Sequence, residues 1–92
     1  MNISRLESIC ALEFAQCAVV DGTRDFSTLF RSRGVSTGEN IGKWIGQIFR
    51  STGTMARVNG DTITYLGQCV PLRDFMRGVC AKFGALMAVA AA

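Results

Sequence analysis

Apolar residues recur every three or four positions over the first twenty residues of the chain. This spacing places side chains on one face of an α-helix, so we expect a helix over residues 4–20. Ser4 and Glu7 have the spacing of a capping box at its first turn. Glu13 falls within the apolar stripe, where its carboxylate needs either a cationic partner from the next segment or a position at the rim. The stripe consists of Ile3, Leu6, Ile9, Cys10, Phe14, Cys17 and Val20.

A second, shorter helix is predicted to follow Thr23 or Asp25, either of which can cap it, and to end before Gly34. Arg31 and Arg33 close this helix, where basic side chains complement the helix dipole and could equally contact phosphate. Either arginine could also be the partner that the carboxylate in the first helix needs.

A third helix, predicted over residues 37–52, has the clearest amphipathic pattern in the chain. Ser36 and Glu39 have capping-box spacing, and Gly53 suits the left-handed position that follows many helices. The apolar arc consists of Ile41, Trp44, Ile45, Ile48 and Phe49, and the opposite arc carries Asn40, Lys43, Gln47, Arg50 and Ser51.

Gly38, Gly42 and Gly46 repeat every four residues along this helix, and each costs roughly 1 kcal/mol of helix stability relative to alanine. We expect the close approach of another backbone to offset this cost, either from a packed helix or from a phosphate strand. Trp44 lies where the two arcs meet, so it either packs in the core or stacks on a base.

Two β-prone runs, residues 54–58 and 62–66, flank the dipeptide Asn59-Gly60. This dipeptide tolerates the two positive φ angles of a type I′ turn, so we expect a two-stranded hairpin over residues 54–66.

The last helix should begin near Pro71, whose missing N–H would be unpaired in a first helical turn. Its apolar stripe is wide and runs into a tail without charge, so we expect a second copy of the chain to bury part of it. The stripe is Leu72, Phe75, Met76, Val79, Cys80, Phe83, Leu86 and Met87, and the predicted homodimer interface is Phe83, Leu86, Met87 and Val89. Together these elements predict a mostly α-helical α+β fold in a single domain, residues 1–92.

The composition, with 49% hydrophobic and 18% charged residues over 92 positions, describes one globular core. Arg5, Glu7 and Glu13 interrupt the first apolar stretch, so we expect no signal peptide, no membrane span and an intracellular location in the cytoplasm, nucleoid or nucleus. The four cysteines form no Cys-x-x-Cys motif and histidine is absent, so we expect no metal, no cofactor, no small-molecule substrate and no catalytic residue. Buried small hydrophobes are the expected role of the cysteines, with a disulfide framework as the alternative.

The net charge of +3 is unevenly distributed, because residues 22–58 hold six basic and two acidic residues. Such a patch favours a polyanion, and we expect nucleic acid, DNA in preference to RNA, as the partner. A solvated basic face without a partner is the alternative. The expected contact residues are Arg31, Arg33, Asn40, Lys43, Gln47, Arg50, Arg57 and Asn59.

The predicted order of helix, helix, turn, helix, hairpin and helix resembles that of winged helix-turn-helix domains. The resemblance places residues 37–52 as the recognition helix and residues 54–66 as the wing, and it implies a small DNA-binding transcription regulator. The run Leu72-Arg-Asp-Phe75 is similar to a Leu-Arg-x-Phe helix in the coat proteins of flexible filamentous plant viruses, which implies an RNA-binding fragment as an alternative. A protein-interaction or oligomerisation module without nucleic acid is a third possibility.

Overall fold

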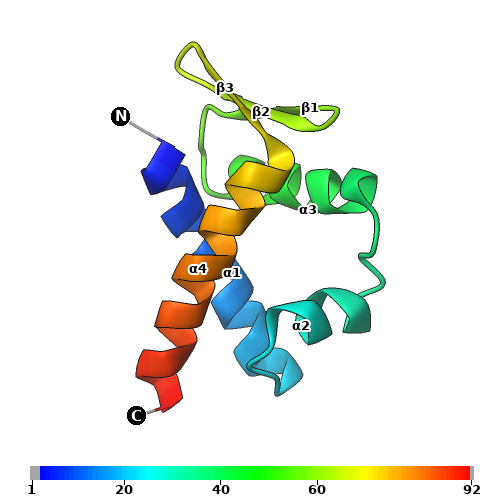
Figure 1. Cartoon of the computed structure of the whole chain (residues 1–92), viewed down its shortest axis with the longest axis vertical. Coiled ribbons are helices and arrows are strands. Elements are labelled where there is room, and N and C mark those ends of the chain that lie inside the picture. Colours follow the sequence, from blue (N-terminus) through cyan, green and yellow to red (C-terminus); the bar gives the residue numbers. More distant parts are fainter. Residues whose placement is uncertain (1–2, 92) are drawn as a thin grey trace.

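The computed structural model describes residues 3–91, and the side chains of residues 3–89. This part of the chain forms four helices and a small three-stranded sheet, which confirms the mostly α-helical α+β fold, and Figure 1 shows the sheet at one end of the molecule. The elements are α1 (Ile3–Asp21), α2 (Phe26–Ser32), α3 (Gly38–Ser51), β1 (Arg57–Asn59), β2 (Thr62–Tyr65), β3 (Gln68–Pro71) and α4 (Leu72–Ala91).

The two long helices, α1 and α4, pack against each other and form the spine of the molecule (Figure 1). Leu6 and Phe14 of α1 and Phe75 and Phe83 of α4 belong to one core cluster and are at most 2% exposed. Burying each such side chain stabilises the fold by roughly 1.5–3 kcal/mol. The predicted first and last helices are therefore confirmed, although Val20 of the predicted stripe is 80% exposed.

A polar contact crosses this packed pair of helices. The Lys82 ammonium donates a hydrogen bond to the Glu7 carboxylate over 2.7 Å, and the carboxylate lies over Gly78, where a Cβ atom would clash with it. The predicted capping box at Ser4 is wrong, because α1 has already begun at Ile3 and Glu7 turns to α4 instead. Gly78 is thus a close-approach glycine that makes room for an ion pair.

Aromatic side chains join α1, α2 and α3. The ring of Phe14 lies 5.0 Å from that of Phe30 and 4.7 Å from that of Trp44, and Phe26 lies 5.0 Å from Phe83. Such edge-to-face pairs add to the area that the rings bury. Trp44 therefore packs against the core.

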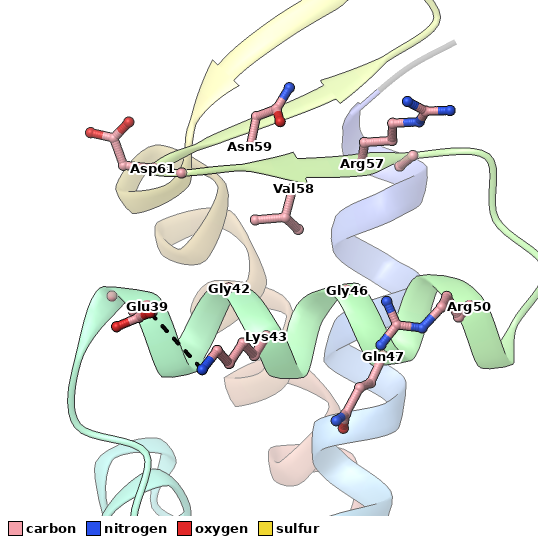
Figure 2. A pocket seen from close by; sticks show the side chains of 13 residues that line it. Glu39, Gly42, Lys43, Gly46, Gln47, Arg50, Arg57, Val58, Asn59 and Asp61 are labelled. Atoms are coloured by element: carbon pink, nitrogen blue, oxygen red, sulfur yellow. Dashed lines mark ion pairs between the residues drawn. The ribbon is translucent and has the colours of Figure 1, made fainter.

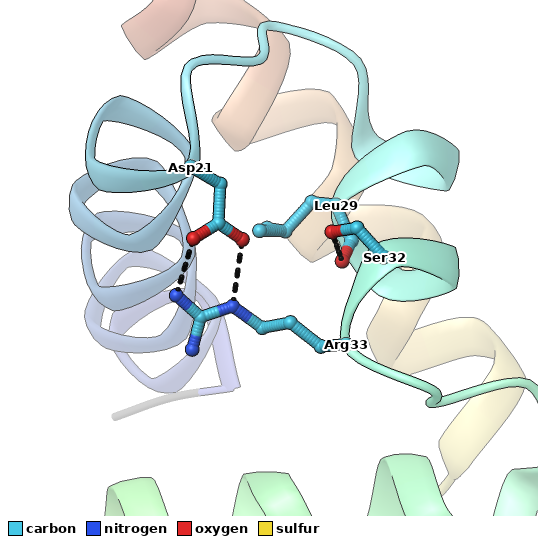
Figure 3. A network of polar contacts seen from close by, with 4 residues as sticks. All are labelled: Asp21, Leu29, Ser32 and Arg33. Carbon is cyan, nitrogen blue, oxygen red and sulfur yellow. Dashed lines mark hydrogen bonds and ion pairs between the residues drawn. The ribbon is translucent and has the colours of Figure 1, made fainter.

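Arg33 ties the end of α1 to α2 and α3. Its guanidinium donates two 2.8 Å hydrogen bonds to Asp21, as Figure 3 shows, and lies 5.6 Å from the Trp44 ring centre. The hydrogen bonds from Arg33 lower the pKa of Asp21 below its usual range. Glu13 therefore does not obtain Arg33 as its partner, and no ion pair joins it to Arg31 among the described residues.

The three strands form an antiparallel sheet in the order β1-β2-β3. The third strand was not expected, and Pro71 is its last residue instead of lying in the first turn of the following helix. Proline has no N–H to donate, but its carbonyl can still accept a hydrogen bond, so it is tolerated at the end of an edge strand. The strand β3 therefore ends at Pro71, directly before α4.

The turn between β1 and β2 lies one residue later than predicted. Asn59 pairs with Thr62, so the two central residues of the turn are Gly60 and Asp61. Gly60 has a φ of +57°, whereas Asn59 has no positive φ. The hairpin is therefore confirmed, but the type I′ turn at Asn59-Gly60 is wrong.

Paired positive φ angles occur instead between β2 and β3. Tyr65 pairs with Gln68, and the two residues between them, Leu66 and Gly67, have φ angles of +51° and +80°. Positive φ at both central positions is the mark of a type I′ turn. A leucine thus occupies a position that glycine, asparagine or aspartate usually fills.

Candidate nucleic-acid interface

The interface predicted from the sequence is centred on α3, and its caps fix where this helix begins and ends. The hydroxyl oxygen of Thr37 accepts a 3.2 Å hydrogen bond from the Asn40 backbone N–H, so Thr37 is the N-cap and the predicted cap at Ser36 is wrong by one residue. Thr52 is the C-cap, and Gly53 follows with a φ of +68°, as predicted. The apolar arc packs as expected, with Ile45, Ile48 and Phe49 buried and Ile41 and Trp44 half-buried.

The glycine repeat of α3 lies beneath β1. A Cβ atom at Gly42 would lie 3.2 Å from Cγ1 of Val58 and 3.9 Å from the carbonyl oxygen of Gly60. The close approach at Gly42 is therefore made by the Val58 side chain of the hairpin, and neither a packed helix nor a phosphate strand is needed to explain this glycine. Gly46 is different, because a Cβ atom there would meet only Nη1 of Arg50, at 3.8 Å.

A groove of about 1030 Å³ runs between α3 and β1 (Figure 2). Val58 points from β1 toward α3, whereas Arg57 and Asn59 point to the other face of the strand. Successive side chains of a strand point to opposite faces, so Val58 packs toward α3 while Arg57 and Asn59 lie on the face that is turned away from it. The groove is lined by Gly38, Glu39, Gly42, Lys43, Gly46, Gln47, Arg50, Ala56, Arg57, Val58, Asn59, Gly60 and Asp61.

Most of the predicted contact residues lie together at this groove. Those that line it are Lys43, Gln47, Arg50, Arg57 and Asn59. Arg33 does not, because it is held by Asp21 and Trp44 on the opposite side of α3. Arg31 is exposed on α2 and Asn40 is half-buried at the start of α3, and neither lines the groove.

The charge along the groove changes sign from one end to the other. Glu39 and Asp61 lie at the end where α3 begins, and Arg50 and Arg57 lie at the end where it finishes (Figure 2). Lys43 lies between them, 3.9 Å from Glu39 in an exposed pair of little energetic value. A polyanion is therefore favoured at the Arg50 end and repelled at the Glu39 end.

Neither Arg50 nor Arg57 has a hydrogen bond or ion pair with any described residue. Both are exposed and lie toward the end of α3, but Arg50 extends from the helix and Arg57 from the face of β1 that is turned away from it. Arg33 and Lys82, in contrast, are each held by a carboxylate at hydrogen-bond distance. The donors of both arginines are thus open to a ligand.

The sequence did not indicate the acidic end of this groove. The predicted capping box gives Glu39 a role within the helix only, and Asp61 lies inside the range predicted as the hairpin. The contact between a hairpin tip and the first turn of α3 depends on how β1 packs, which no local pattern reports. The glycine repeat was the available signal, since it marked the helix face that β1 covers.

The predicted dimer surface divides into two groups. Phe83 and Met87 are 2% and 7% exposed and pack within the core of the chain itself. Leu86 and Val89 are 38% and 76% exposed, and with Leu12 of α1 they line a shallow apolar pocket of about 470 Å³. Only the second group could meet another copy.

Among the described residues, no cluster of His, Cys, Asp and Glu could hold a metal ion, and no helix has both the length and the apolar character needed to cross a membrane. The cysteines are free, and burial raises the pKa of Cys10 to about 12.

Comparison with protein-family models, curated protein sequences and solved structures finds no match to this chain. The geometry of the groove therefore carries the functional argument.

Proposed function

We propose that this chain is a nucleic-acid-binding module, a small DNA-binding regulator of transcription that works inside the cell. In this proposal α3 contacts base edges through Lys43 and Gln47, and Arg50 and Arg57 each contact a phosphate. The observation that carries the proposal is the pair of arginines without partners, Arg50 and Arg57, at one end of the groove.

The chemistry of these side chains suits a nucleic acid. Arginine presents a planar set of donors that matches phosphate and guanine edges, and glutamine and asparagine can pair with adenine. Gln47 lies one helical turn before Arg50, so both extend from the exposed side of α3. Each phosphate that such a cation neutralises releases condensed counterions, which is a large part of the affinity for DNA.

The order of elements supports a winged helix-turn-helix arrangement for this binding. In it, α2 and α3 would form the helix-turn-helix and the hairpin of β1 and β2 would act as the wing. Duplex DNA is then the expected ligand. RNA binding, as in a viral coat protein, is the competing outcome that the same experiment resolves.

Binding should be measured by fluorescence anisotropy with duplex DNA, single-stranded RNA and heparin as separate probes. We expect Arg50→Gln and Arg57→Gln each to weaken duplex binding by about fivefold or more, because each removes a charged contact. Arg24→Gln is the matched control, since Arg24 is exposed in the loop between α1 and α2 and does not line the groove.

Three results would contradict the proposal. The first is no binding to any nucleic acid, and the second is equal binding to heparin, which would indicate only a polyanion surface. The third is an equal loss of affinity in Arg24→Gln. A clear preference for single-stranded RNA would keep nucleic-acid binding but replace the DNA regulator with the RNA-binding alternative.

A further inference from the structure

The groove between α3 and β1 differs in character on the two sides of Val58. On the side of Glu39 and Asp61, acidic side chains stand at the rim. On the other side, Gly46 forms the wall and Arg50 stands at the rim, whereas Arg57 extends from the face of β1 that is turned away from α3. The Gly46 side, which has Arg50 and no lining carboxylate, is therefore the side that favours an anionic ligand.

Gly46 is not explained by packing within the chain. A Cβ atom at Gly42 would crowd the Val58 side chain, but a Cβ atom at Gly46 would be in ordinary van der Waals contact with the flexible end of Arg50. Gly46 lies in the middle of α3, where glycine is among the least favourable residues for helix stability. The space that it leaves opens into the groove beside a guanidinium that has no partner among the described residues.

We infer that the groove holds one phosphodiester strand against the bare backbone of α3 at Gly46, with Arg50 as the side chain that contacts its phosphate. The inference rests on the proposed nucleic-acid binding and specifies how the ligand is seated. The strand can belong to a duplex or to a single-stranded molecule, because both present the same sugar–phosphate chemistry. A methyl group at position 46 would narrow the groove where that strand lies and would keep the strand away from the helix backbone.

The test is a pair of glycine substitutions with opposite expected effects on binding. Gly46→Ala should raise the melting temperature by about 4 °C or more, because alanine favours the helix, and should weaken binding by about fivefold or more. Gly84→Ala is the matched control, because Gly84 is exposed in α4, away from the groove, and a Cβ atom there would meet nothing within 4 Å. It should give a similar gain in melting temperature and leave binding unchanged.

A double-substitution cycle separates direct contact from an effect through Arg50. If the strand contacts Gly46, adding Gly46→Ala to Arg50→Gln should weaken the remaining binding further. If Gly46 only gives Arg50 room, the second substitution should have no effect in that background, and the inference is wrong. Duplex DNA and single-stranded RNA are measured in parallel to show which source supplies the strand.

The inference and the proposed function fail in different ways. Normal binding by Gly46→Ala, together with weakened binding by Arg50→Gln, would overturn the seating of the strand and keep the proposed function. Absence of binding by the unaltered chain would overturn both. A lower melting temperature in Gly46→Ala would mean that the glycine is required by the fold, which also contradicts the inference.

Discussion

Leu66 occupies a backbone conformation that leucine rarely adopts. Its φ is +51° and its side chain is 72% exposed. No other non-glycine residue in the described part of the chain has a positive φ. A left-handed conformation costs an L-residue with a Cβ roughly 1 kcal/mol or more, and an exposed side chain at a turn gains little from packing.

We expect Leu66→Asn to stabilise the fold by about 0.5–1 kcal/mol, because Asn-Gly is the preferred pair for a type I′ turn. The measurement is the free energy of unfolding in urea. Met55→Asn is the control, since Met55 is also an exposed apolar residue, at 86%, but has no positive φ. Equal stabilisation in both variants would show that removal of exposed apolar surface, and not the turn, is responsible.

Residue-level predictions succeeded where the determining contacts are local. Asp25 caps α2 as one of two predicted candidates, and its carboxylate accepts a 2.9 Å hydrogen bond from the Thr28 backbone N–H. Ser36 and Thr37 are both able to cap α3, and the choice between them depends on which residue the preceding turn holds in extended conformation. The Glu7–Lys82 pair joins residues 75 positions apart, so no spacing rule could have indicated it.

At the scale of elements, hydrophobic periodicity located all four helices to within a few residues, because the pattern needs no knowledge of the partner. The strand β3 was missed for the opposite reason. Gln68-Cys69-Val70-Pro71 has little alternation of its own and ends in proline, and it becomes a strand by pairing with β2. The position of the groove could not be predicted either, because it depends on the packing of β1 on α3.

The exposed apolar surface shared by α1 and α4 carries the prediction of a homodimer. Leu12, Leu86 and Val89 line it and are 49%, 38% and 76% exposed. Burial of the exposed part of each in a second copy contributes a corresponding fraction of the roughly 1.5–3 kcal/mol for a fully buried side chain, before the entropy of association. We expect Leu86→Ser with Val89→Ser to shift a dimer to monomer in sedimentation equilibrium. Val19→Ser with Val20→Ser is the control, because these two valines are exposed but do not line this pocket.

A monomer at every concentration would contradict the dimer, and so would a dimer that the Leu86 and Val89 substitutions leave intact. Phe83 and Met87 are unsuitable for this test, because their removal would open the core of the chain itself. If the dimer forms, it would present two copies of α3, as DNA-binding dimers do for adjacent half-sites.

At the scale of the whole molecule, the basic residues differ in what holds them. Arg33 and Lys82 each hold two elements together through a carboxylate, whereas Arg50 and Arg57 stand at the groove without a described partner. The sequence predicted the excess of positive charge between residues 22 and 58 but could not separate structural from open cations. That separation depends on tertiary contacts, and together with the position of the groove it locates the candidate interface.

The most direct test of the central claim is the salt dependence of nucleic-acid binding. The claim is that Arg50 and Arg57 neutralise phosphates, and each neutralised phosphate of duplex DNA contributes about 0.9 to the slope of log affinity against log salt concentration. The slope for duplex DNA should therefore fall by about 1.8 when both arginines are replaced by glutamine. An unchanged slope in that double variant, with binding still measurable, would contradict the account.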